Sequence, residues 1–112
     1  MVAVRRDFAV VGHRRGAEPS RRAEALLEAL PKSAWRTIRW REGSTGWLRG
    51  RFVAQRCWRV TSDGWRHLGW LIGAREAAGQ EPCRKYDWSN FGPTMPLATM
   101  VEYAHRRHWV EQ

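Results

Sequence analysis

The residue whose type and spacing could do chemistry is Glu111, a carboxylate near the end of the chain. Residues 96–112 have the spacing of an amphipathic helix, which at about 100° per residue places Glu111 about 40° from Leu97. The apolar stripe of this helix would consist of Leu97, Met100, Val101, Ala104 and His108. A carboxylate on that stripe needs a partner, because an unpaired buried charge costs several kcal/mol. A metal ion could supply it, and so could Arg107, one helical turn earlier.

Two other interpretations of these residues stay open. Glu111 is next to last in the sequence, where helices fray, so a solvated glutamate loosely paired with Arg107 needs no functional explanation. His105 and His108 are three residues apart and, together with Glu111, could form a transition-metal site. Histidines beside Arg106 and Arg107 are more often DNA-facing or packing residues, so we favour that role for them.

Both ends of the sequence have the pattern of cuts through a larger domain. No glycine or asparagine cap follows Trp109, although a helix that ends by itself usually has one. Residues 1–4 begin directly in a strand-like run. We therefore expect a piece of a larger domain.

The composition indicates one domain with a polyanionic partner. A chain of 112 residues can hold only a modest core. Lys and Arg number 20 against 11 Asp and Glu, and nearly all of the cations are arginines, which suit bidentate phosphate contacts and ring stacking. Nucleic acid is therefore the first candidate partner. No apolar run is long enough to cross a membrane and no signal peptide is present, so we expect a cytoplasmic, nucleoid-associated protein with free thiols at Cys57 and Cys83.

Hydrophobic periodicity predicts a small antiparallel sheet between two helices. Residues 1–11 read as one strand and 12–18 as a loop. Ser20 is the expected N-cap of a short helix that Pro31 ends. Strands follow from residue 35, and Asp63-Gly64 predicts a two-residue type I′ turn that pairs residues 56–61 with 65–72. Residues 73–83 are expected to form a loop, 85–90 another strand, and 96–112 the final helix.

The strands interleave arginine with many of the eight tryptophans. Aromatic faces that stack on bases, set among guanidinium groups that hold phosphates, are what a surface for unpaired nucleotides requires. The alternative is that tryptophan fills the core and arginine lines the wet face, which we expect for at least half of the tryptophans. The residues that we assign to DNA contact in this region are Arg39, Trp40, Arg41, Trp47, Arg49 and Arg51.

Four segments together resemble the DDE transposases of bacterial insertion sequences, in the branch whose ribonuclease H-like core carries a β-strand insertion before the last acidic residue. The segments are LPKSAWRTIRWREG (30–43), GWLIG (69–73), KYDWSN (85–90) and PLATMVEYAHRRHWVEQ (96–112). The resemblance extends over essentially the whole chain, and its specificity lies in the joint pattern.

The resemblance implies roles for residues of the final helix. In that family the last catalytic glutamate lies four residues after an arginine, as Glu111 follows Arg107. By this resemblance Glu111 is a catalytic metal ligand, Arg107 holds a DNA phosphate, and Tyr103 and Arg106 contact DNA. Tyr103 lies one residue before the position of the family's tyrosine. The family's two catalytic aspartates would lie upstream of Met1.

The chemistry of that family needs more than this chain contains. Phosphodiester cleavage and strand transfer use two divalent ions held by three carboxylates, because Mg²⁺ binds weakly to any single side chain. We therefore expect Mg²⁺ to act in the intact enzyme, which could be a dimer on transposon-end DNA. We expect this chain alone to be inactive.

The sequence thus predicts an α+β fragment of a ribonuclease H-like domain. Residues 1–31 would form a core strand and helix, 32–93 a β-rich insertion, and 94–112 the helix with the last acidic residue. The expected function is that of a DDE transposase fragment. The main alternative is a free-standing, basic, tryptophan-rich nucleic-acid-binding module without catalysis, and the third is a gene remnant that does not fold stably.

Overall fold

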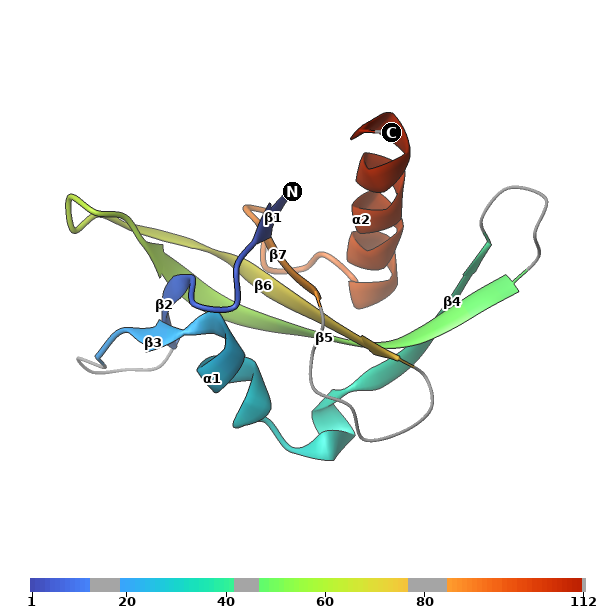
Figure 1. Cartoon of the computed structure of the whole chain (residues 1–112), viewed down its shortest axis with the longest axis horizontal. Helices are drawn as coiled ribbons and strands as arrows, with labels where there is room; N and C mark the ends of the chain where they lie inside the picture. The colour runs from blue at the N-terminus through green and yellow to red at the C-terminus, as the bar shows by residue number, and fades with distance from the viewer. Residues whose placement is uncertain (13–18, 42–46, 77–84, 112) are drawn as a thin grey trace.

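One antiparallel sheet dominates the structure, a computed structural model that describes residues 1–12, 19–41, 47–76 and 85–111. Side chains are described at 1–12, 19–39, 49–75 and 85–104. The seven strands have the order β1-β7-β6-β5-β2-β3, and β4 pairs with β5 (Figure 1). The strands are β1 (Val2–Val4), β2 (Ala9–Gly12), β3 (Arg21–Arg22), β4 (Arg36–Arg41), β5 (Trp47–Val60), β6 (Arg66–Glu76) and β7 (Lys85–Ser89). The helices are α1 (Ala23–Glu28) and α2 (Leu97–Glu111), with a 3₁₀ turn η1 (Lys32–Ala34) before β4.

The sheet curls into a half-barrel because β1 and β2 are neighbours in sequence but not in the sheet. They lie four strand spacings apart, about 19 Å in a flat sheet. Five Cα steps reach only about 18 Å when fully extended, and the link is not extended, since the Phe8 amide donates to the Arg5 carbonyl at 3.0 Å. The Phe8 ring lies 5.9 Å from that of Trp88 on β7, which closes the curl.

The prediction of a ribonuclease H-like α+β fragment is wrong. The sheet is antiparallel throughout its described pairings, and the described part of the chain has only two short helices. The expected first strand is divided at residues 5–8, so that β1 pairs with β7 while β2 pairs with β5. Hairpins rather than helical crossovers connect the long strands, which is the connection that antiparallel pairs allow.

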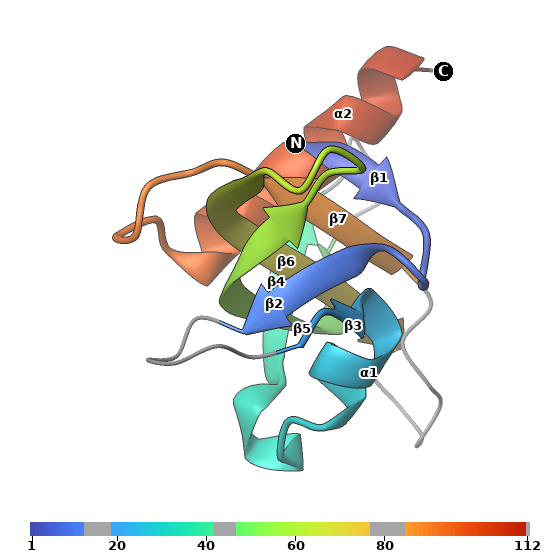
Figure 2. The same cartoon turned by 90° about the vertical axis from the view of Figure 1, so that its left-hand side faces the viewer.

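The two helices cover opposite faces of the sheet, as both views show (Figure 1, Figure 2). On the α1 face, Ala23, Leu26 and Leu27 pack into the main hydrophobic cluster. Its other buried members are Val10, Trp35, Val53, Cys57, Leu71, Tyr86 and Trp88. On the other face α2 packs against β4 and β5 and buries Met100, Val101 and Ala104. The apolar stripe expected on the final helix is confirmed for these three residues.

Tertiary contacts rather than Ser20 start α1. The N-cap is Arg22, which makes no side-chain capping bond. The first two helical amides instead donate to carbonyls of the link between β1 and β2, Ala23 to Phe8 at 2.8 Å and Glu24 to Arg6 at 2.9 Å. These carbonyls satisfy donors that a side-chain cap would otherwise take, so the Ser20 N-cap prediction is wrong.

The β5–β6 hairpin is confirmed, but its turn differs from the prediction. A type I′ turn needs positive φ at both Asp63 and Gly64, and in the described residues only Gly64 has it, at 86°. The Gly64 amide donates to the Thr61 carbonyl and the Thr61 amide to the Trp65 carbonyl, both at 2.9 Å. The connection is therefore a three-residue turn with a left-handed glycine at its end.

Strand β6 is also longer than expected. Residues 73–76, which belong to the predicted loop 73–83, instead continue β6 and pair with residues 50–53 of β5. A glycine within a strand marks a close backbone approach as readily as a loop. This extension brings Arg75 into the sheet.

Candidate nucleic-acid interface

The candidate catalytic side chains lie outside the described part of the structure. The backbone at Arg106, Arg107 and Glu111 belongs to α2, but the side chains from residue 105 onward are not described. Tyr103 is 45% exposed, and its ring lies 5.2 Å from that of Phe91. Among the described residues no three His, Cys, Asp or Glu side chains form a group that could hold a metal ion. The roles of these residues in metal and DNA binding stay predictions.

Four arginines lie on one face of the sheet. Arg39 on β4 is the register partner of Arg49 on β5, and Arg51 on β5 is the partner of Arg75 on β6. Cross-strand partners share a face, as do residues two apart on one strand. We call Arg39, Arg49, Arg51 and Arg75 the arginine face; it lies on the side of the sheet that α1 covers farther along.

This arrangement places like charges directly opposite each other. Cross-strand partners have Cβ atoms about 4.5–5.5 Å apart, and like charges at that spacing destabilise a sheet. Arg49 is exposed and Arg51 half-buried, and neither side chain makes an ion pair or hydrogen bond within the described residues. An anion that binds the guanidinium groups of Arg49 and Arg51 would relieve their repulsion with the neighbouring arginines.

Arg75 is held in place by Glu28 of α1 and by Trp35, which directly precedes β4. Its Nη2 donates to Glu28 Oε2 at 2.7 Å, and its guanidinium carbon lies 4.0 Å from the ring centroid of Trp35. Trp35 is 6% exposed, so its ring is a fixed platform in the core. A guanidinium at this distance over an indole face is attracted by the ring quadrupole. Trp35 therefore acts as a core residue that also positions one arginine of the face.

The arginine face continues onto a two-stranded ribbon. Strand β6 ends at Glu76, opposite Gly50, whereas β4 and β5 go on pairing as far as Arg41 and Trp47. The ribbon extends beyond the body of the sheet at the right of Figure 1. The side chains of Trp40, Arg41 and Trp47 are outside the described part of the chain, and their assignment to DNA contact stays a prediction.

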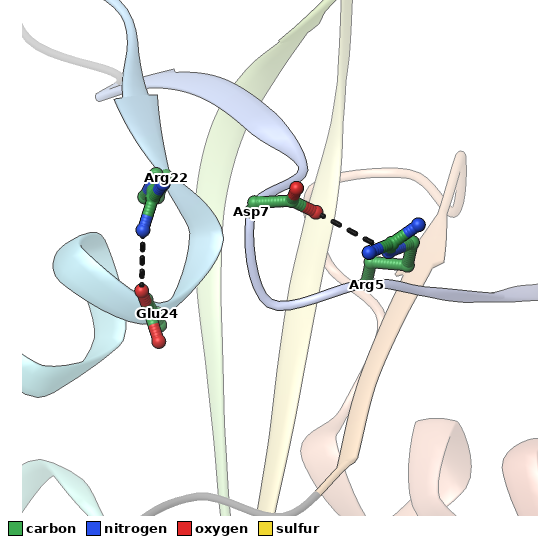
Figure 3. A network of polar contacts seen from close by, with 4 residues as sticks. All are labelled: Arg5, Asp7, Arg22 and Glu24. Carbon is green, nitrogen blue, oxygen red and sulfur yellow. Dashed lines mark hydrogen bonds and ion pairs between the residues drawn. The ribbon is translucent and has the colours of Figure 1, made fainter.

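The opposite end of the sheet is also basic but partly neutralised. Arg5 pairs with Asp7 at 3.6 Å and Arg22 with Glu24 at 3.2 Å, on the loop before β2 and at the start of α1 (Figure 3). The Arg5 side chain is 90% exposed and that of Arg22 is 65% exposed, so each pair contributes little to stability. These two pairs lower the positive charge at this end, as the Arg75–Glu28 pair does at the arginine face.

The tryptophans with described side chains occupy three kinds of site. Trp35 and Trp88 are buried in the core, and Trp58 and Trp70 are half-buried. Trp70 donates its Nε1 proton to the Gly92 carbonyl at 3.0 Å, while the Arg56 guanidinium lies 5.3 Å from its ring centroid. Only Trp65 has a largely exposed ring among these, at 69%.

Sequence reasoning selected Arg39, Arg49 and Arg51 but missed Arg75 and did not single out Trp65. Arg75 was assigned to a loop, and only the β5–β6 register places it opposite Arg51. Residues 70–76 (WLIGARE) show no apolar alternation, so the sequence pattern did not signal that the strand continues. Burial, which separates Trp65 from the other tryptophans with described side chains, has no counterpart in the sequence pattern.

Comparisons with known proteins do not assign the chain to a family. No family model, curated protein or solved structure matched it. In the described residues no helix is long and apolar enough to cross a bilayer. The functional proposal below is therefore based on the geometry and charge of the arginine face.

Proposed function

We propose that this chain is a nucleic-acid-binding module whose main contact surface is the arginine face. The observation that carries the proposal is the placement of Arg49 and Arg51, two residues apart on one strand and each opposite another arginine. Glu28 offsets the charge of Arg75, but the side chains of Arg49 and Arg51 make no ion pair within the described residues. A polyanion would supply the missing counter-charge, since several guanidinium groups can engage neighbouring phosphates.

The charge of the whole chain supports the same partner. A formal charge of +9 favours association with polyanions at long range and makes the affinity depend on salt. Contacts of this type go to phosphates rather than base edges, so they position the nucleic acid with little sequence selectivity. The proposed activity is therefore binding, and no bond is made or broken in it.

The transposase resemblance stays a prediction beside this proposal. The ribonuclease H-like core that would bring catalytic carboxylates together is not the observed fold, and the side chains of Arg107 and Glu111 are not described. The role of Mg²⁺ in an intact enzyme likewise stays a prediction. Binding through the arginine face needs neither a metal ion nor the final residues of α2.

A charge-removal experiment tests the proposal. We would measure the affinity for fluorescein-labelled oligonucleotides by anisotropy over a series of salt concentrations. Each phosphate contact contributes about 0.9 to the slope of log K against log salt for duplex DNA and about 0.7 for single strands. The double variant Arg49→Gln/Arg51→Gln is expected to reduce the slope by about 1.4–1.8 in total.

Arg36→Gln is the matched control because Arg36 is an exposed arginine of β4 on the opposite face, where it pairs with Phe52 in register. It should change the affinity less than either single variant of the arginine face. A control variant that weakens binding as much as Arg49→Gln would show that net charge alone is responsible. Absence of binding even at low salt would overturn the proposal.

A further inference from the structure

We infer that the tip of the β5–β6 hairpin is a second nucleic-acid contact, at which the exposed ring of Trp65 stacks on an unpaired base. This inference rests on the proposed function and specifies its ligand as a nucleic acid with unpaired bases. Trp65 is the tryptophan with the most exposed described side chain, at 69%, and it directly follows the turn.

The turn holds the backbone of Trp65 in a fixed position. The Trp65 carbonyl accepts a hydrogen bond from the Thr61 amide at 2.9 Å and lies 3.2 Å from the Thr61 hydroxyl oxygen. The Trp65 amide donates to Asp63 Oδ1 at 3.4 Å, and the Thr61 hydroxyl donates to the same carboxylate. An exposed ring on a fixed backbone loses little further conformational entropy when it binds, because Trp has only two side-chain torsions.

The charges around the tip favour an anionic polymer over an uncharged apolar partner. His67 lies two residues after Trp65 and Arg59 is its register partner, so both share the face of Trp65, while Arg66 is exposed on the opposite face of the strand. A further cation, Arg21, comes from β3. Val10 of β2 lies between Arg21 and Arg59 and is the register partner of both, so the backbones of Arg21 and Arg59 are two strand spacings, or about 10 Å, apart. The side chains of Arg21 and Arg66 make no ion pair or hydrogen bond within the described residues.

The acidic groups near the tip are already engaged. The Asp63 carboxylate accepts the hydrogen bonds from Thr61 and Trp65, and Asp7 and Glu24 are paired with arginines (Figure 3). The exposed Trp65 ring thus has basic residues near it, and the nearest carboxylate, Asp63, is hydrogen-bonded within the turn. Surfaces that bind single strands combine such rings, which stack on bases, with cations that hold phosphates.

The hairpin tip is separate from the arginine face. From Arg49 to Val60 the strand β5 spans about 36 Å at 3.3 Å per residue, and the longest dimension of the molecule is 47 Å. Variants at one end therefore leave the other end intact. This separation allows the two contacts to be tested independently.

The test compares a base-bearing oligonucleotide with an abasic one of the same length and charge. Trp65→Ala is expected to weaken the binding of oligothymidylate by about 5- to 140-fold, the effect of losing one stacked base. It should leave the affinity for the abasic oligonucleotide unchanged. Trp65→Phe, which keeps a ring, should retain most of the difference, and Ser62→Ala, an exposed position in the same turn, should retain all of it.

Each contrary outcome identifies what fails. If Trp65→Ala loses the same affinity for both oligonucleotides, or loses none for either, the stacking contact is overturned. The proposed function is then still decided by the salt slopes of the Arg49 and Arg51 variants. Loss of binding to anionic phosphatidylglycerol vesicles without loss on oligothymidylate would assign the ring to a membrane surface and overturn the inference. If the unaltered chain binds neither of these single strands, the stacking contact fails, and binding of duplex DNA at low salt then decides the proposed function.

Discussion

Gly69 provides a sharp test of the pairing between β6 and β7. It lies in β6, where a Cβ atom would be 2.3 Å from the Ser89 carbonyl oxygen and 2.6 Å from Trp88 Cζ2. A carbon and a carbonyl oxygen of neighbouring strands normally approach to about 3.3 Å. Gly69→Ala would therefore require β6 and β7 to separate by about 1 Å, and the blocking atom is backbone, which cannot rotate away.

The expected cost follows from that displacement. Overpacking a tight interior costs about 1–3 kcal/mol, and we expect the upper end because a strand pair and the buried Trp88 ring must both move. For a domain of about this size 1 kcal/mol changes Tm by about 4–8 °C, so a cost of about 3 kcal/mol lowers Tm by about 12–24 °C. Thermal and urea unfolding followed by circular dichroism would measure it.

Two other glycines supply matched controls. Around Gly92 a Cβ would meet nothing within 4 Å, so Gly92→Ala should change the stability by less than about 0.5 kcal/mol. Gly64 has equally open surroundings but a φ of +86°, so its alanine variant should cost about 1–2 kcal/mol through backbone strain alone. Equal Tm values for the Gly69 and Gly92 variants would refute the β6–β7 register described above.

Two further predictions concern the core and the arginine face. Burial raises the pKa of the Cys57 thiol to about 12, so between pH 9 and 12 this thiol ionises only in the unfolded chain. In urea titrations over this range the unfolding free energy should therefore fall by up to about 1.4 kcal/mol per pH unit more than that of Cys57→Ala. Equal losses for the two proteins would contradict the burial of the thiol. Arg75→Gln should lower the unfolding free energy by about 1–2 kcal/mol because it removes a cation stacked on buried Trp35. Glu28→Gln should change the unfolding free energy by less than about 0.5 kcal/mol and strengthen oligonucleotide binding, because it removes the anion beside the arginine face. Weaker oligonucleotide binding by Glu28→Gln would contradict the placement of Glu28 beside the arginine face.

Local patterns were sufficient for most of the secondary structure. Alternation of side chains identified β4, β5 and β7, and the spacing of Ala23, Leu26 and Leu27 identified α1, because each depends on residues close in sequence. The same reasoning failed where partners are distant. Ser20 is not the cap of α1, since the carbonyls of Arg6 and Phe8 take its place.

The sequence by itself determined the charge, the abundance of arginine and tryptophan, the β5–β6 hairpin and the apolar stripe of α2. Tertiary structure alone decided that residues 2–12 form two strands at separate places in a curled sheet, which excludes the expected ribonuclease H-like fold. It also decided that Arg75 faces Arg51 and that Trp65 remains exposed while Trp35 and Trp88 are buried. Strand register and burial are set by contacts between segments far apart in the chain, and periodicity within one segment carries no information about them.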